Sequence, residues 1–120
     1  MRPGDPLFTR AVDEFNRGEF FEAHESWEEI WDEADEPERT FLQGLIQAAT
    51  ALHHLGRGRF DPAGRLLAKS LGKLAPYDDG FGGIALARLR DDLRAIQSAL
   101  PTIAAGTTAA PSMPRIGGAP

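Results

Sequence analysis

Apolar residues recur every three or four positions in five separate stretches of this chain, which is the spacing of amphipathic helices. No stretch alternates apolar and polar residues as a half-buried β-strand does. Glycine and proline separate the stretches, and Asp5-Pro6 and Asp61-Pro62 each resemble a helix cap followed by a first-turn proline. The pattern therefore predicts helices over about residues 6–17, 19–35, 37–57, 61–74 and 84–100.

The third of these stretches is apolar on nearly all sides, which indicates a helix covered by several neighbours. One narrow polar stripe interrupts it. The apolar positions are Phe41, Leu42, Leu45, Ile46, Ala48, Ala49, Ala51, Leu52 and Leu55, and the stripe is Gln43, Gln47, Thr50 and His54. We therefore predict an all-α fold, a compact bundle of four to five helices with the third helix at its centre.

The composition changes at Pro101. Four prolines, three glycines and small polar residues follow in the last twenty positions. Such a segment buries too little apolar surface to order itself. We therefore expect a single helical domain over residues 1–100 and a flexible C-terminal tail over residues 101–120.

Composition narrows the class of protein further. A chain of 120 residues is one domain of ordinary size. It has no cysteine, which excludes disulfides and thiolate metal sites. A net charge of −5 argues against nucleic acid as a partner. No apolar run reaches the roughly 20 residues of a membrane span, so we expect a cytoplasmic protein without membrane contact.

The predicted second helix carries unusual chemistry. Between Glu19 and Glu38 there are ten acidic residues and no lysine or arginine. Most of these acids fall on the face that a helical projection turns toward water. His24, however, falls inside an apolar arc between Phe20 and Trp31, and Glu28 lies at the margin of that arc. A carboxylate or imidazole directed inward needs a hydrogen-bonding partner.

A tight antiparallel hairpin of the second and third helices would supply such partners. It would bring His24 level with Gln47 and place Glu28 near Gln43. His53 and His54, about one turn further along the third helix, would lie near Phe20. The hairpin therefore predicts a polar cluster drawn from His24, Glu25, Glu28, Gln43, Gln47, His53 and His54.

Two motifs connect this pattern with a known family. The segment from Phe15 to Glu25 (FNRGEFFEAHE), followed by Trp27 and Trp31, resembles the opening signature of the domain of unknown function 309 family. The segment FLQGLIQ from Phe41, followed by His53 and His54, resembles its second motif. The similarity covers about residues 7–100. It implies a small all-α fold and assigns no catalytic residues. Such proteins often have an acidic cap near position 84, where this chain has Ala85.

Three functions remain open for the polar cluster. His24 and Glu28 with His53 or His54 could hold a metal ion, although their spacing matches no established metal motif. His24 and Glu28 could also act in metal-free acid–base catalysis. The preferred interpretation is an interaction or ligand-binding protein organised around the cluster, with no cofactor identified. Its partner would be another protein or a second copy, because the acidic second helix and a basic run have opposite charge. The basic run is Arg57, Arg59, Arg65, Lys69 and Lys73.

Overall fold

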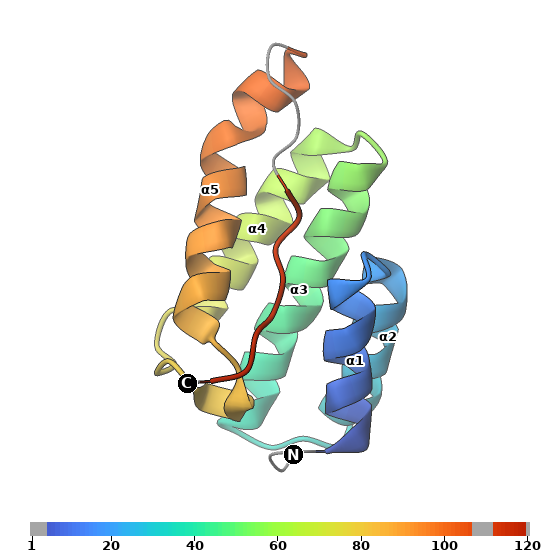
Figure 1. The fold of residues 1–120 in the computed structure, drawn as a ribbon, viewed down its shortest axis with the longest axis vertical. Helices are drawn as coiled ribbons and strands as arrows, with labels where there is room; N and C mark the ends of the chain where they lie inside the picture. The colour runs from blue at the N-terminus through green and yellow to red at the C-terminus, as the bar shows by residue number, and fades with distance from the viewer. Residues whose placement is uncertain (1–4, 107–111, 120) are drawn as a thin grey trace.

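The computed structural model describes residues 5–106 and 112–119, and it is built from five α-helices and one short 3-10 turn (Figure 1). Over the described residues the extended pairing amounts to one antiparallel bridge, between Ile84 and Gly118. The all-α prediction is therefore confirmed. The helices are α1 (Pro6–Asn16), α2 (Phe20–Trp31), α3 (Glu38–Gly56), α4 (Phe60–Leu74) and α5 (Leu86–Ala104), with the turn η1 (Phe81–Gly83) before α5.

Helix α3 lies at the centre of the bundle, as its apolar circumference predicts. It packs against α2 on one side and α4 on the other, and α1 reaches it through the stacked rings of Phe8 and Phe41. Nine of its residues are buried: Phe41, Leu42, Gly44, Leu45, Ala48, Ala49, Ala51, Leu52 and Leu55. Burial on several sides makes α3 the scaffold that positions the neighbouring helices.

The start of α1 and the end of α2 both have side-chain caps. Asp5 accepts hydrogen bonds from the backbone N–H groups of Leu7 and Phe8 at the start of α1. Helix α2 ends at Trp31, four residues before the expected end. There the Arg39 guanidinium donates to the carbonyl oxygens of Trp31 and Ala34, at 2.9 and 3.3 Å. Arg39 thus satisfies carbonyl groups that a longer helix would have bonded internally.

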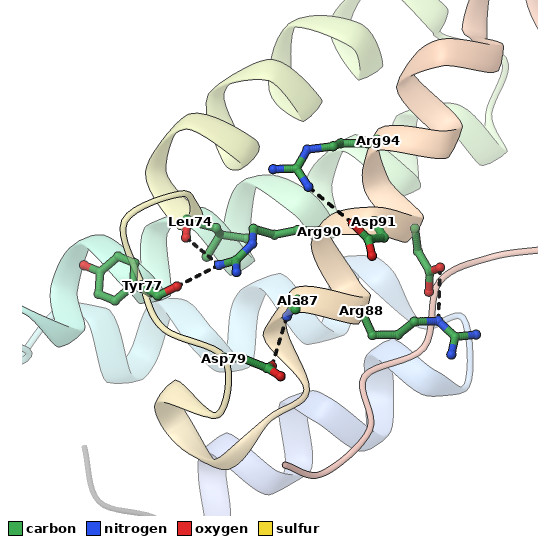
Figure 2. A network of polar contacts seen from close by, with 9 residues as sticks. Leu74, Tyr77, Asp79, Ala87, Arg88, Arg90, Asp91 and Arg94 are labelled. Atoms are coloured by element: carbon green, nitrogen blue, oxygen red, sulfur yellow. Dashed lines mark hydrogen bonds and ion pairs between the residues drawn. The ribbon is translucent and has the colours of Figure 1, made fainter. Parts of the chain in front are cut away.

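The loop between α4 and α5 provides the cap that the sequence of α5 lacks. Figure 2 shows Asp79 accepting a hydrogen bond from the backbone N–H of Ala87, 3.1 Å away, in the first turn of α5. Ala85 has no side chain able to do this, so a carboxylate from the preceding loop replaces the local cap. In the same network Arg90 donates to the carbonyl oxygens of Leu74, the last residue of α4, and of Tyr77 beyond it.

The C-terminal part of the chain differs from the expectation in two respects. Helix α5 continues through Pro101 to Ala104, because Ile103 extends the apolar spacing of Ile96 and Leu100 and is itself buried. Residues 112–119 then run back along the bundle between α5 and α1 (Figure 1), where Ile116 is only 3% exposed. The expected tail of residues 101–120 therefore includes a helical end and a docked segment, while residues 107–111 and 120 lie outside the described part.

Among the helices that the structure describes, none combines the length and the apolarity needed to cross a membrane.

Candidate functional site

The candidate site is a face formed by α2 and α3, and one end of it is built from aromatic and histidine rings. The Phe21 ring lies 4.8 Å from the His24 ring and 5.4 Å from the His53 ring, centroid to centroid. His53 in turn lies 6.0 Å from His54. Phe21 is 47% exposed, which makes it the large hydrophobic side chain most open to solvent in the described structure. The contact of Phe21 with His53 agrees with the register expected of an antiparallel α2–α3 hairpin.

His24 is held by α2 itself. Its side chain is 17% exposed, and its Nε2 atom lies 3.4 Å from the Oε1 atom of Glu28, one turn further along the helix. Its Nδ1 atom donates to the carbonyl oxygen of Phe21. Both ring nitrogens thus contact acceptors, which fixes the ring plane and directs the imidazole toward Glu28.

The other end of the face is a shallow pocket of about 220 Å³. It is lined by Glu28 and Trp31 of α2 and by Gln43 and Ile46 of α3. Arg39 covers part of Trp31, with its guanidinium carbon 3.8 Å from the ring centroid. The pocket therefore combines an apolar surface, an amide and one half-exposed carboxylate. We call the region of Phe21, His24, Glu28, Trp31, Gln43, Ile46, Gln47, His53 and His54 the α2–α3 face.

Three polar atoms of this face are covered without being hydrogen-bonded. Within residues 5–106 and 112–119, the indole Nε1 of Trp31, the Oε1 of Gln47 and the Nδ1 of His54 have no hydrogen-bond partner. The Nε1 of Trp27, deep in the core, has none either. Buried donors and acceptors without a partner cost about 1–3 kcal/mol each, which is why most of them are satisfied in folded proteins. Three of the four such atoms in the described part of the chain belong to residues of the α2–α3 face.

The surroundings of His53 favour its neutral form. Burial is the main cause that lowers the pKa of His53 below the ordinary value of 6.5, and the positive charges of Arg57 and Arg59 and the nearby rings of His54 and His24 add to it. A neutral imidazole carries one donor and one acceptor. At neutral pH His53 therefore presents hydrogen-bonding capacity without charge.

Not every residue of the predicted cluster belongs to this face. Glu25 lies on the opposite side of α2, in a pocket of about 190 Å³ against α1 that also includes Arg10, Glu22 and Glu29. The helical turn between positions 24 and 25 is enough to separate them, because adjacent residues on a helix point about 100° apart. The structure brings Glu28 and Gln43 to one pocket and places His24 and His53 around Phe21.

The sequence pattern did not indicate the buried carboxylate of Glu14 in α1. Glu14 of α1 is only 5% exposed, and its Oε1 accepts a hydrogen bond from Ser26 of α2 at 2.6 Å. Arg10 lies 3.6 Å from the other carboxylate oxygen. Glu14 lies three residues after the buried Ala11, on the same side of α1, which was the available signal. Glu14 and Ser26 join α1 to α2 on the side away from the α2–α3 face.

The part of the chain that the structure describes contains no group of three histidine, aspartate or glutamate side chains placed to hold a metal ion. His24, Glu28 and His53 or His54 are therefore not assembled as a three-ligand centre. The contact between His24 and Glu28 sets an imidazole beside a carboxylate, a pair that could orient a ligand or relay a proton.

A family comparison bears on these residues. The family model described as a domain of unknown function (DUF309) matches residues 8–66, which include all of α2 and α3. These residues belong to the DUF309 family. The family resemblance of the two sequence motifs is confirmed. The DUF309 region carries every residue of the α2–α3 face and ends within α4.

The similarity to a curated relative covers a larger share of the chain than the family model does. The chain is similar to an uncharacterized protein of Aquifex aeolicus (strain VF5), with 34% identity over 85 residues, or 70% of this chain. The chain spans about a quarter of that relative's length, since the aligned region covers 26% of it.

Proposed function

We propose that this protein is a cytosolic binding module whose α2–α3 face receives a basic segment of a partner protein. The observation that carries this proposal is the exposed ring of Phe21 on the same face as a pocket whose walls include Trp31, Ile46 and the half-exposed carboxylate of Glu28. A partner that docks here would cover apolar surface and pair with a carboxylate at the same time. This combination is typical of the centre of a protein interface.

The charge around the face favours a basic partner. The stretch from Glu19 to Glu38 has ten acidic residues and no lysine or arginine, and Arg17 and Arg39 flank it at its two ends. Glu28 is half exposed at the rim of the pocket. A lysine or arginine could lay its aliphatic stem against Trp31 and Ile46 and bring its charge to Glu28. In this arrangement His24 is a positioning residue for Glu28.

The proposal can be tested by NMR on the ¹⁵N-labelled full chain. One probe is a designed amphipathic peptide of lysine and leucine, and its counterpart has glutamate in place of lysine at the same positions. We expect the lysine peptide to shift the indole N–H resonance of Trp31 and the side-chain amide of Gln47. The indole resonance of Trp27, which is fully buried, should stay in place. The glutamate peptide should shift none of these resonances.

Two matched variants separate a site from general charge attraction. Glu28→Gln should weaken binding of the lysine peptide about two- to fivefold, the range expected for an exposed ion pair of up to about 1 kcal/mol. Glu29→Gln removes the same charge from the same helix on the α1 side and should leave the affinity unchanged. Equal effects of the two variants, or shifts limited to exposed acids with Trp31 unmoved, would contradict the proposal.

A further inference from the structure

The docked C-terminal segment is recognised through its backbone. At the end of α1 the side-chain amide of Asn16 makes two hydrogen bonds with Ile116. Its Nδ2 donates to the Ile116 carbonyl oxygen at 2.9 Å, and its Oδ1 accepts from the Ile116 N–H at 2.7 Å. One side chain thus engages both polar groups of a single residue, as a neighbouring β-strand would.

Backbone pairing continues on the other side of the segment. The N–H of Ala85 donates to the Gly117 carbonyl oxygen at 2.8 Å, and the N–H of Ala119 donates to the Gly83 carbonyl oxygen at 3.0 Å. These bonds join the segment to the extended residues between η1 and α5. They require an extended backbone, and most of them make no demand on side-chain identity.

Two residues of the segment, Pro114 and Ile116, are buried. Ile116 is 3% exposed and contributes to a slot of about 170 Å³ whose other walls include Phe8, Val12 and Ile84. The two residues after Ile116 are glycines, and a Cβ atom at either position would meet nothing within 4 Å. Arg115, by contrast, is exposed. The segment is therefore bound as an extended strand with Pro114 and Ile116 turned inward.

The same segment is loosely packed on its other side. Between it and α5 lies an open cleft of about 690 Å³, lined by Arg88, Asp92, Ile96, Met113 and Arg115 among others.

We propose that the groove formed by α1 and residues 82–85 is a peptide-binding site, and that residues 112–119 are its resident, exchangeable occupant. The mode is addition of an extended strand, in which backbone hydrogen bonds give affinity and one pocket gives specificity. The site is distinct from the α2–α3 face and does not depend on the function proposed for that face. Its ligand is the same segment supplied in trans.

Tethering determines how the exchange must be measured. A segment attached to its own groove competes at an effective concentration of about millimolar. A free peptide of the same sequence therefore binds the wild-type chain weakly, even where the groove accepts it well. Displacing the resident segment removes this competition, so the groove then reports its intrinsic affinity.

The experiment uses a fluorescent peptide of residues 112–119 and three full-length chains. Ile116→Asp releases the resident segment, because a carboxylate at this buried position is costly. We expect the Ile116→Asp chain to bind the peptide at least tenfold more tightly than the wild-type chain does. Adding Asn16→Ala to Ile116→Asp should remove that gain. A peptide with Arg115→Ala should bind as the unmodified peptide does, whereas a peptide with Ile116→Asp should not bind.

Circular dichroism melts establish that each variant is folded, and the milder Ile116→Thr chain replaces Ile116→Asp if the latter is not. A folded released chain that binds the peptide no better than wild type would overturn the proposal. Binding that persists unchanged after Asn16→Ala would overturn it too, because the groove would then not be the place of contact.

Discussion

The hydroxyl group of Ser70 donates a hydrogen bond to the backbone carbonyl oxygen of Gly44, 2.7 Å away, where α4 packs on α3. Ser70 is fully buried. A Cβ atom on Gly44 would lie 2.7 Å from Cδ2 of Leu74 and 2.8 Å from its Cγ. Glycine at position 44 therefore lets α3 and α4 approach each other closely. This close approach brings the Ser70 hydroxyl within hydrogen-bonding distance of the α3 backbone.

Gly44→Ala should destabilise the fold by about 1–3 kcal/mol, because the added methyl group must displace Leu74 from a packed core. Gly72→Ala in α4 is the matched control, since nothing lies within 4 Å of its Cβ position. That control should be neutral or stabilising by up to about 1 kcal/mol through helix propensity. Urea denaturation measures both. Equal effects would mean that α3 and α4 separate easily at Gly44.

Truncation of the core of α3 should be costly. Leu45 is fully buried and Leu52 is 1% exposed. Leu45→Ala and Leu52→Ala should each lower the free energy of unfolding by about 2–5 kcal/mol, through lost burial and the cavity that remains. Denaturant melts would measure these losses. A cost below about 1 kcal/mol at both positions would show that α3 is not the scaffold of the bundle.

The fold could be predicted from the sequence because it follows from the helical spacing of the apolar residues. The apolar residues of α5, which recur every three or four positions, and the nearly all-apolar surface of α3 predict where the helices lie and which of their sides are buried. The ends of the helices were less accessible. Asp79 caps α5 from a loop, and Arg39 closes α2 from the next helix, so both ends depend on contacts that exist only after folding.

The candidate site was predictable in part for the same reason. His24 and Glu28 are one turn apart on one helix, so their contact follows from local geometry. Glu25 was grouped with the cluster because of its residue type, whereas its position on α2 places it in the pocket against α1. The docking of Ile116 was not predictable from composition, since its main partner, Asn16, lies one hundred positions earlier in the chain.

The contact between Glu14 and Ser26 should matter for stability. Ser26→Ala removes the 2.6 Å hydrogen bond to a carboxylate that is almost fully buried. We expect a loss of about 1–3 kcal/mol, because the carboxylate keeps its desolvation cost and loses a donor. Ser98→Ala on the exposed side of α5 is the control and should change the stability by less than about 0.5 kcal/mol. Matching losses in thermal melts of the two variants would refute a structural role for this contact.

His53 should make the stability depend on pH in a defined direction. Burial first, and the charge of Arg57 second, lower the pKa of His53 in the folded chain below 6.5, its ordinary value. The unfolded chain therefore binds a proton at a higher pH than the folded chain does. The contribution of His53 to stability is complete above about pH 6.5 and is lost as the pH falls through the folded-state pKa. His53→Gln should reduce the fall in the free energy of unfolding between about pH 7.5 and pH 5.5. Direct titration of the His53 ring by NMR provides the check, and a midpoint at or above 6.5 would contradict the prediction.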